Sequence, residues 1–314
     1  MKQRVITAIC LLAVLAVVVW QINTPILLIA VAFLSAVASG EIMKCAKVEN
    51  TFIRVVGIIF SACFQLFASA RVLEPWVSEA AWGKVIGAVP NIVYIIVLSL
   101  VFFLAMLKNY AYTTFEDVSV SFFASVVVPF GFSIFIRLRD MFVDEQFGIY
   151  LIFYALICAL ATDTGAQLTG MAFGKHKMSP NISPKKTIEG AFGGLVVSMI
   201  LNAVALTLYN KLANSVIPQN MATLLLAMVL PTSFLGMMGD LSASVLKRNF
   251  GVKDFGKIFP GHGGVMDRMD SSPCLLHMQL HLLQPNYFNL LKEGIPYEKN
   301  ISFRFNRFYR NTEP

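Results

Sequence analysis

Long apolar runs alternate with short polar segments along most of this chain. The runs cover about residues 5–20, 25–39, 52–70, 85–107, 119–136, 147–172, 188–209 and 221–240. Several of them reach the roughly 20 residues that a helix needs to cross a ~30 Å hydrocarbon core. The first two are shorter and almost contiguous, which fits a tight helical hairpin. The pattern predicts an all-α, polytopic integral membrane protein with about 8–9 transmembrane helices.

A few residues interrupt these runs. Pro90, Pro129 and Pro231 lie in apolar segments, where a missing N–H and a steric clash with the preceding turn predict helix kinks. Glu41, at the end of the second run, is ambiguous, and a structural capping role is the favoured interpretation.

No repeat, low-complexity tract or extended linker divides the chain, so a single domain is expected. Within it we distinguish three regions. Residues 1–146 form N-terminal transmembrane helices, about five spans. Residues 147–271 are expected to form a transmembrane region that contains two polar motifs, at 163–194 and 239–271, and is the candidate catalytic region. Residues 272–314 are an atypical tail with, at most, a weak last helix.

Composition supports the membrane assignment. Hydrophobic residues make up 57% of the 314 residues, charged residues only 14%, and the mean hydropathy is +0.69, whereas soluble proteins average roughly 25% charged residues. The net charge of +7 therefore indicates a cytoplasmic face and anionic lipid or substrate, and no nucleic-acid partner. The five cysteines are scattered without a CxxC pair, which indicates neither disulfides nor zinc.

The basic residues also predict an orientation. If the N-terminus lies inside, fifteen Lys and Arg before the tail face the cytoplasm and five face outside. Positive charge concentrates in cytoplasmic loops. Both charged motifs, and the polar site they form, are thus expected at the cytoplasmic face of the plasma (inner) membrane.

The segment Gly239–Ser271 holds most of the chain's concentrated charge. Five Lys and Arg, three Asp and one His stand between Lys247 and Asp270, among several glycines. If the preceding apolar run continues as a helix, Asp240, Ser244 and Lys247 follow i, i+4, i+7 and share one face. A carboxylate, a hydroxyl and an ammonium would then converge.

The GHGG sequence at 261–264 follows in the same segment. Its three glycines allow positive φ angles and close backbone approach, and its N–H groups could form an anion-binding concavity. Asp267 and Asp270 come next, three residues apart. Carboxylates beside several cations suit Mg²⁺ held against a polyphosphate. The alternative, a solvated basic loop between membrane helices, does not account for the glycines.

A second polar motif spans 163–194. Asp163 stands inside an apolar run, where an unpaired acid is costly, and Asp163, Gln167 and Gly170 follow i, i+4, i+7. The same stripe would also suit close helix packing through small residues. A functional role for the polar residues and a packing role for the stripe could coexist.

The sequence SPKKTIEG at 183–190 predicts a helix start. Thr187 is a suitable N-cap and Glu189 would lie in the first turn. Lys185 and Lys186 precede this start, and lysines and helix N-termini both favour phosphate.

These motifs resemble a known family. The pattern SxLKRxxxxKDxGxxxPGHGGxxDRxDS, from Ser244 to Ser271, is similar to the signature of the phosphatidate cytidylyltransferases (CDP-diacylglycerol synthases), and SPKKTxEG also resembles that family. The resemblance covers about residues 160–271 strongly and the earlier spans only in hydrophobic pattern. The family has an aromatic residue near Gln167, so this departure leaves the role of Gln167 open.

The tail departs from the family, whose members continue into a closing apolar helix. Here the sequence after Ser271 turns polar, basic and aromatic, which motivates the hypothesis of an altered or out-of-frame C-terminus. His277 and His281 have a zinc-compatible spacing, but no third ligand is in view and accidental spacing is favoured.

The resemblance implies transfer of the cytidylyl group of CTP to phosphatidate, giving CDP-diacylglycerol and pyrophosphate. It implies Mg²⁺ as cofactor, with K⁺ as a further candidate, and leaves a homodimer open. A membrane transporter, or a cytidylyltransferase acting on another lipid phosphate, are the alternative functions.

The site residues expected from the motifs and the resemblance fall into three groups. The catalytic candidates are Asp240, Lys247, Arg248, Asp267 and Arg268. The substrate-binding candidates are Lys185, Lys186, Ser244, Lys253, Gly261, His262, Gly263 and Gly264. The metal candidates are Asp163, Asp240, Asp267 and Asp270. His262 could donate to phosphate or serve the loop structurally.

Overall fold

The computed structural model describes residues 17, 26–68, 91–140, 145–212, 217, 219–259 and 263–269. Apart from residue 17, the first predicted run, residues 5–20, lies outside the described residues, as does the tail after residue 269, so the expectations for them stay predictions.

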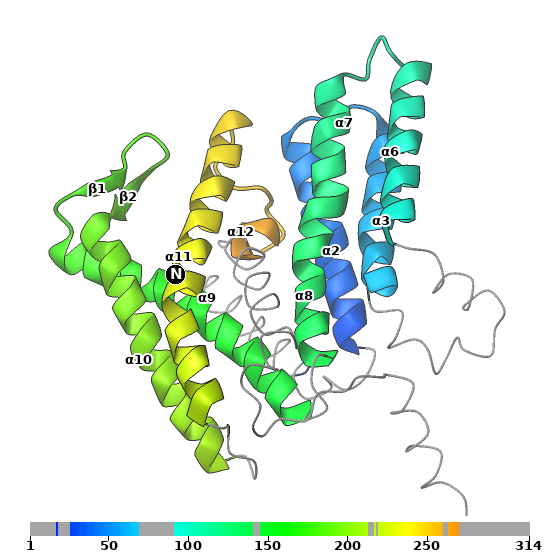
Figure 1. The fold of residues 1–314 in the computed structure, drawn as a ribbon. Helices are drawn as coiled ribbons and strands as arrows, with labels where there is room; N and C mark the ends of the chain where they lie inside the picture. The colour runs from blue at the N-terminus through cyan, green and yellow to red at the C-terminus, as the bar shows by residue number, and fades with distance from the viewer. Residues whose placement is uncertain are drawn as a thin grey trace, which may run out of the picture.

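Helices make up about four fifths of the described chain, in two groups (Figure 1). The N-terminal group contains α2 (Ile26–Cys45), α3 (Thr51–Ala68), α6 (Asn91–Lys108), α7 (Phe115–Phe122), the π-helical turn η1 (Phe123–Val127) and α8 (Val128–Asp140). The C-terminal group contains α9 (Glu145–Phe173), β1 (Lys177–Ser179), β2 (Ser183–Thr187), α10 (Ile188–Leu212) and α11 (Gln219–Asn249). The short α12 (Met266–Met269) lies between α11 and α2 in Figure 1.

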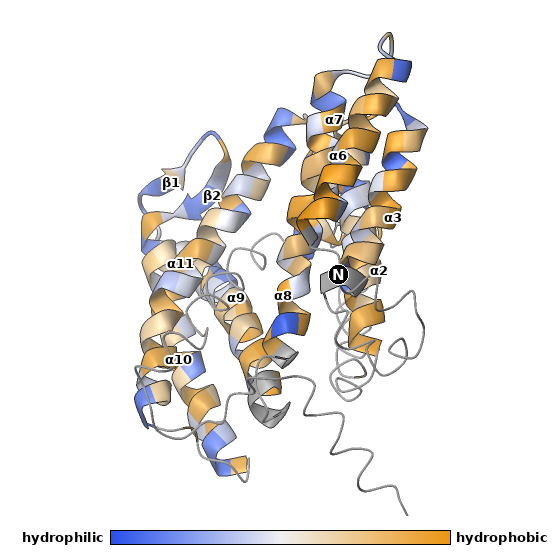
Figure 2. Cartoon of the chain, turned by 45° about the vertical axis from the view of Figure 1, so that its right-hand side comes forward, coloured by the Kyte–Doolittle hydropathy of each residue, from blue (hydrophilic) through white to orange (hydrophobic). Residues whose placement is uncertain are grey.

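Five described helical segments are long and apolar enough to cross a membrane. They are α2, the continuous α7–η1–α8 segment, α9, α10 and α11. Large apolar side chains such as Phe33, Leu104 and Phe192 are exposed on these and neighbouring helices, and Figure 2 shows apolar residues along most of α3 and α6. Outward-facing apolar surface of this kind belongs in lipid. The chain is thus a polytopic membrane protein by length and composition, and the count of 8–9 helices stays a prediction.

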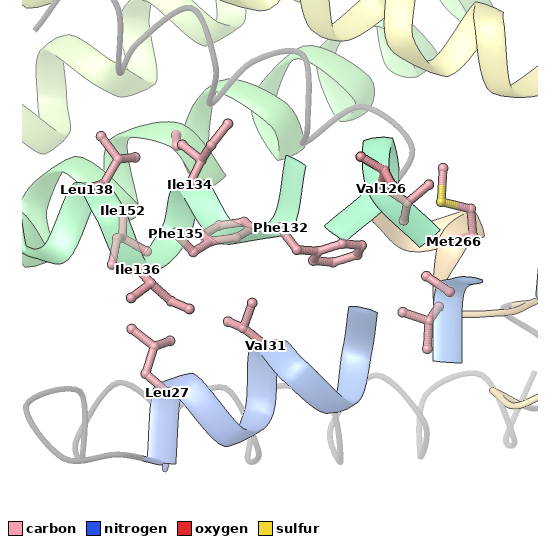
Figure 3. Packing of buried hydrophobic residues seen from close by; sticks show 14 of the residues in the cluster. Leu27, Val31, Val126, Phe132, Ile134, Phe135, Ile136, Leu138, Ile152 and Met266 are labelled. Atoms are coloured by element: carbon pink, nitrogen blue, oxygen red, sulfur yellow. The ribbon is translucent and has the colours of Figure 1, made fainter. Parts of the chain in front are cut away.

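A hydrophobic core joins the N-terminal group to α9. Leu27 and Val31 of α2 point toward the side chains of α8, among them Phe132 and Ile136 (Figure 3). Ile152 of α9 belongs to the same buried cluster. Through α8, the two groups of helices are packed into one body.

The helix through Pro129 is maintained by a π-helical turn and by buried side chains. Proline cannot donate to the preceding turn, and η1 lies directly before it. Ser39 Oγ of α2 donates to the Ala124 carbonyl at 2.6 Å, and Gln65 Nε2 of α3 donates to the Pro129 carbonyl at 2.8 Å. The backbone oxygens around the proline are therefore satisfied by neighbouring helices, as the apolar environment requires.

A two-stranded hairpin departs from the all-α expectation. β1 and β2 pair antiparallel, with Lys177 opposite Thr187 and Ser179 opposite Ser183. The predicted helix start is confirmed: α10 begins at Ile188, and Thr187 Oγ1 accepts the Gly190 N–H at 3.1 Å. The hairpin therefore ends directly at the N-cap of α10.

Glycines bring α9 and α10 into close contact, which confirms a packing role for this stretch. A Cβ added to Gly194 would stand 2.6 Å from the Thr162 carbonyl oxygen, and one added to Gly165 would stand 2.7 Å from Val197 Cβ. Small residues at such positions let helix backbones approach in a membrane. Asp163 is carried on this tightly fixed part of α9.

We expect Gly194→Val to destabilise the protein, because the new side chain must push α9 away from α10. Overpacking typically costs about 1–3 kcal/mol. The thermal unfolding midpoint in detergent should fall clearly, whereas Val196→Leu, at an exposed position of the same helix, should leave it nearly unchanged. Equal midpoints for both variants would contradict the close packing.

Candidate active site

The C-terminal half of α11 carries two charged residues of the site on one face. Asp240 and Lys247 are seven residues apart in a continuous helix, as the spacing predicted, and so are separated by two turns, about 10 Å along the axis. Ser244 lies between them on this face. Pro231 is inside α11, before this stretch.

The end of α11 turns the chain back toward the same face. Gly251 has φ +67°, a conformation that glycine adopts without strain. Its N–H donates to the Arg248 carbonyl at 3.0 Å, and the Val252 N–H donates to the Lys247 carbonyl at 2.9 Å. This pair of hydrogen bonds is the Schellman pattern of a helix C-terminus, and it starts the segment that returns to α11.

The β1–β2 hairpin places Lys186 next to Asp240. Lys186 Nζ of β2 donates to Asp240 Oδ2 in an ion pair, and both side chains are partly buried. The two motifs separated by more than fifty residues in sequence thus meet here, as the shared chemistry predicted. Lys185, the next residue toward the turn, is exposed.

A second ion pair joins α11 to α12. Lys247 Nζ donates to Asp267 Oδ1 at 3.0 Å, and the two side chains are only 13% and 4% exposed. The other oxygen, Oδ2, accepts the backbone N–H groups of Phe255 at 2.8 Å, Gly264 at 3.0 Å and Gly256 at 3.4 Å. Asp267 therefore links two described parts of the loop between α11 and α12, around residues 255–256 and at Gly264.

Gly263, the third residue of the GHGG sequence, lies close to this carboxylate. Phe259 and Gly263 exchange backbone hydrogen bonds of 2.9 and 3.1 Å, and Gly263 has φ +88°. A Cβ added to Gly263 would stand 2.8 Å from Asp267 Oδ2. The positive φ angle expected in the GHGG sequence is found at Gly263. The Gly264 N–H, expected to bind an anion, donates in this structure to the Asp267 carboxylate. Gly261 and His262 lie outside the described residues.

Asp163 lies close to the first ion pair. The charges of Asp240, Lys186 and Arg268 all act on its carboxylate. Asp163 also lines a small cavity with Thr162 and Ser233, and its side chain has no hydrogen bond to any residue that the structure describes. Four charged side chains thus lie near one another: Asp163 of α9, Asp240 of α11, Lys186 of β2 and Arg268 of α12.

The structure also describes three other residues that the sequence singled out. Arg248 is exposed, and its Nε reaches the Ile182 carbonyl only at 3.5 Å. Lys253 and Gln167 are exposed. Asp270 lies outside the described residues.

Glu41 is a residue of this region whose partner the sequence did not reveal. Its Oε1 accepts the Val265 N–H at 3.1 Å and its Oε2 accepts the Met266 N–H at 2.9 Å, so it caps α12 from the distant helix α2. The sequence did offer one signal: Glu41 is an acidic residue at the end of an apolar run. Acidic residues within membrane segments are rare and usually have a polar partner.

The residues around Asp163 fit a Mg²⁺ ion bound together with a nucleotide. No three His, Cys, Asp or Glu side chains of the described segments are grouped to hold a metal by themselves. Mg²⁺, however, is commonly bound by one or two carboxylates together with water and substrate phosphates. Asp163 and the Oδ1 atom of Asp240 can serve in this way. Asp267 already accepts from four donors, so its role as a ligand stays a prediction.

Comparisons with known proteins give the family context. The model of the cytidylyltransferase family matches residues 2–284. The phosphatidate cytidylyltransferase of Bacillus subtilis is 33% identical over 274 residues, which is 86% of this chain and 93% of that protein. The enzyme of the same name from Staphylococcus aureus is 34% identical over 271 residues, covering 86% of this chain and 94% of that protein. The corresponding Staphylococcus haemolyticus protein has the same identity and coverage.

We expect Lys247→Met to destabilise the protein, because it leaves the Asp267 carboxylate buried without its cation. Breaking a buried ion pair in this way costs about 3–5 kcal/mol. Arg248→Met, at the exposed neighbouring position, is the matched control and should change the thermal midpoint little. A midpoint for Lys247→Met as high as that of the control would show that the ion pair does not hold the loop.

Proposed function

The chain belongs to the cytidylyltransferase family, and on this basis we propose that it is a phosphatidate cytidylyltransferase. It transfers the cytidylyl group of CTP to phosphatidate and yields CDP-diacylglycerol and pyrophosphate. The observation that carries this conclusion is the meeting of the two polar motifs, Lys186 with Asp240 beside Asp163 and Arg268, in a chain related over most of its length to enzymes of that name.

The reaction needs positioning and charge compensation more than proton transfer. An oxygen of the phosphatidate phosphate attacks the α-phosphorus of CTP, and the bond from that phosphorus to the oxygen bridging to the β-phosphorus breaks. Pyrophosphate leaves with the bonding electrons. A phosphate monoester is largely ionised near pH 7, since its second pKa is about 6, so no dedicated general base is required.

The basic side chains of the site supply the charge compensation. Lys186 and Arg268 lie near the carboxylates on which a metal would be held, and cations placed there stabilise the charge that develops on the phosphate oxygens. Lys185, Lys253 and Arg248 are exposed in the two motif segments, where they can attract CTP and the lipid head group. Lys247 acts on the loop through Asp267.

Mg²⁺ is the proposed cofactor, with K⁺ as a candidate second cation. Asp163 and Asp240 would hold Mg²⁺, and Asp267 and Asp270 are further candidates. When bound, the ion neutralises nucleotide phosphate charge and assists departure of pyrophosphate. Without the ion, Asp240 pairs with Lys186 and Asp267 pairs with Lys247.

We place the site at the cytoplasmic face of the plasma membrane. The excess of basic residues in the loops that carry both motifs supports this orientation, and CTP is available on that side. The membrane-spanning helices around the site let a lipid substrate remain in the bilayer while its phosphate reaches the loops.

We expect Asp240→Asn to abolish formation of CDP-diacylglycerol from labelled CTP and phosphatidate by purified protein, with a loss of roughly 100-fold or more, because Lys186 loses its ionic partner and Mg²⁺ a ligand. Glu116→Gln, which removes an exposed charge in α7, should retain normal activity. Near-normal turnover of Asp240→Asn would remove the assignment of Asp240, and a labelled product other than a CDP-lipid would exclude the proposed reaction.

The metal proposal is tested separately by removing divalent cations. EDTA should stop turnover and added Mg²⁺ should restore it, because the triphosphate charge is then no longer neutralised. Asp163→Asn should raise the Mg²⁺ concentration for half-maximal activity several-fold, with wild-type protein titrated in parallel. Full activity in EDTA, or an unchanged Mg²⁺ requirement in the variant, would contradict the assignment.

A further inference from the structure

The N-terminal helix α2 reaches across the molecule to the segment that carries Asp267 and Arg268. Glu41 is 7% exposed, and its two carboxylate oxygens accept the N–H groups of Val265 and Met266 at 3.1 and 2.9 Å. These two residues directly precede Asp267. An anion that accepts two backbone N–H groups at a helix start is held firmly, because the hydrogen bonds are charge-assisted and aligned with the helix dipole.

Two glycines of the active-site segment are packed against this same carboxylate. A Cβ added at either Gly256 or Gly264 would collide with the carboxyl group of Glu41, and the two glycines also approach each other, since a Cβ on Gly256 would stand 3.0 Å from Gly264 Cα. Neither glycine needs a positive φ angle. Their missing side chains are therefore explained by the space that Glu41 occupies.

A second contact from α2 lies one turn after the first. The Cys45 thiol donates to the Phe255 carbonyl at 3.0 Å, and Phe255, Val265 and Met266 are all buried. Figure 3 shows Met266 beside the end of α2. We call the pair Glu41 and Cys45 the α2 clasp. It holds the loop between α11 and α12 at two points, Phe255 and the pair Val265 and Met266.

The α2 clasp and Asp267 share one short stretch of backbone. Asp267 accepts the N–H groups of Phe255, Gly256 and Gly264, and Glu41 accepts those of the next two residues, Val265 and Met266. Two carboxylates from opposite ends of the chain thus bind successive N–H groups of the same turn. The position of Arg268, which follows at once, depends on both.

Building on the proposed function, we propose that Glu41 is a positioning residue for cytidylyl transfer, and that Cys45 assists it. From α2 they hold the loop so that Arg268 is directed at the reacting phosphates. A displacement of about 1 Å in such a group can lower a rate by as much as 100-fold. Substrate is not touched by Glu41, because backbone N–H groups occupy both of its oxygens.

The decisive variant is Glu41→Gln, which keeps the shape of the side chain but turns one acceptor into a donor that faces a backbone N–H. We expect kcat to fall at least tenfold while KM for CTP changes less than about threefold, because the exposed basic residues that attract CTP are retained. Glu49→Gln, the same substitution at an exposed site just after α2, should leave both constants unchanged.

Tryptic cleavage after Lys253 and Lys257, both exposed in the loop, gives a readout independent of activity. Release of the α2 clasp should speed cleavage there about tenfold in Glu41→Gln and not in Glu49→Gln. If Glu41→Gln does not fold, Cys45→Ala should show the same pattern in milder form, with kcat reduced about two- to fivefold, compared with Cys63→Ala in α3 as control.

The outcomes separate the two proposals. A wild-type protein that makes no CDP-lipid overturns the proposed function, whatever the variants do. An active wild type with unchanged kcat or unchanged loop cleavage in Glu41→Gln overturns the positioning role. A lower kcat in Glu41→Gln that comes with lower protein stability and with no acceleration of loop cleavage also overturns it. That result would indicate a purely structural residue.

Discussion

The arrangement of the site depends on the nearly solvent-free Asp267 carboxylate. It accepts hydrogen bonds from one lysine of α11 and three backbone N–H groups of the loop, and so replaces water with four fixed donors. A buried carboxylate that lost this set would carry a large desolvation cost. The loop is therefore coupled to α11, and through Lys186 and Asp240 α11 is coupled to the hairpin.

Local features of the site could be predicted from the sequence because they follow the helix period. Asp240 and Lys247 share a face since both lie in one helix, and Thr187 caps α10 because a short polar side chain stands directly before an apolar run. The family was recognised from a long run of charged residues and glycines, and the relatives confirm it. All of these signals lie within a few tens of residues.

Contacts between distant segments could not be predicted in the same way. Glu41 binds backbone N–H groups, and every residue except proline has one, so no residue type in the sequence marks its partners. The β1–β2 hairpin was missed for a related reason. Its base is tied by Glu189, whose carboxylate accepts the backbone N–H groups of Lys175 and His176, and a helical periodicity analysis does not detect such a short, polar element.

The contact between α2 and α12 has a consequence for biosynthesis. A ribosome releases α2 into the bilayer early, yet the N–H groups that Glu41 accepts belong to residues more than two hundred positions later. Until those residues have been synthesised, the Glu41 carboxylate lacks its native hydrogen-bond donors, and water or lipid head groups must donate to it instead. The native surroundings of this carboxylate are therefore completed only after the loop before α12 has been synthesised.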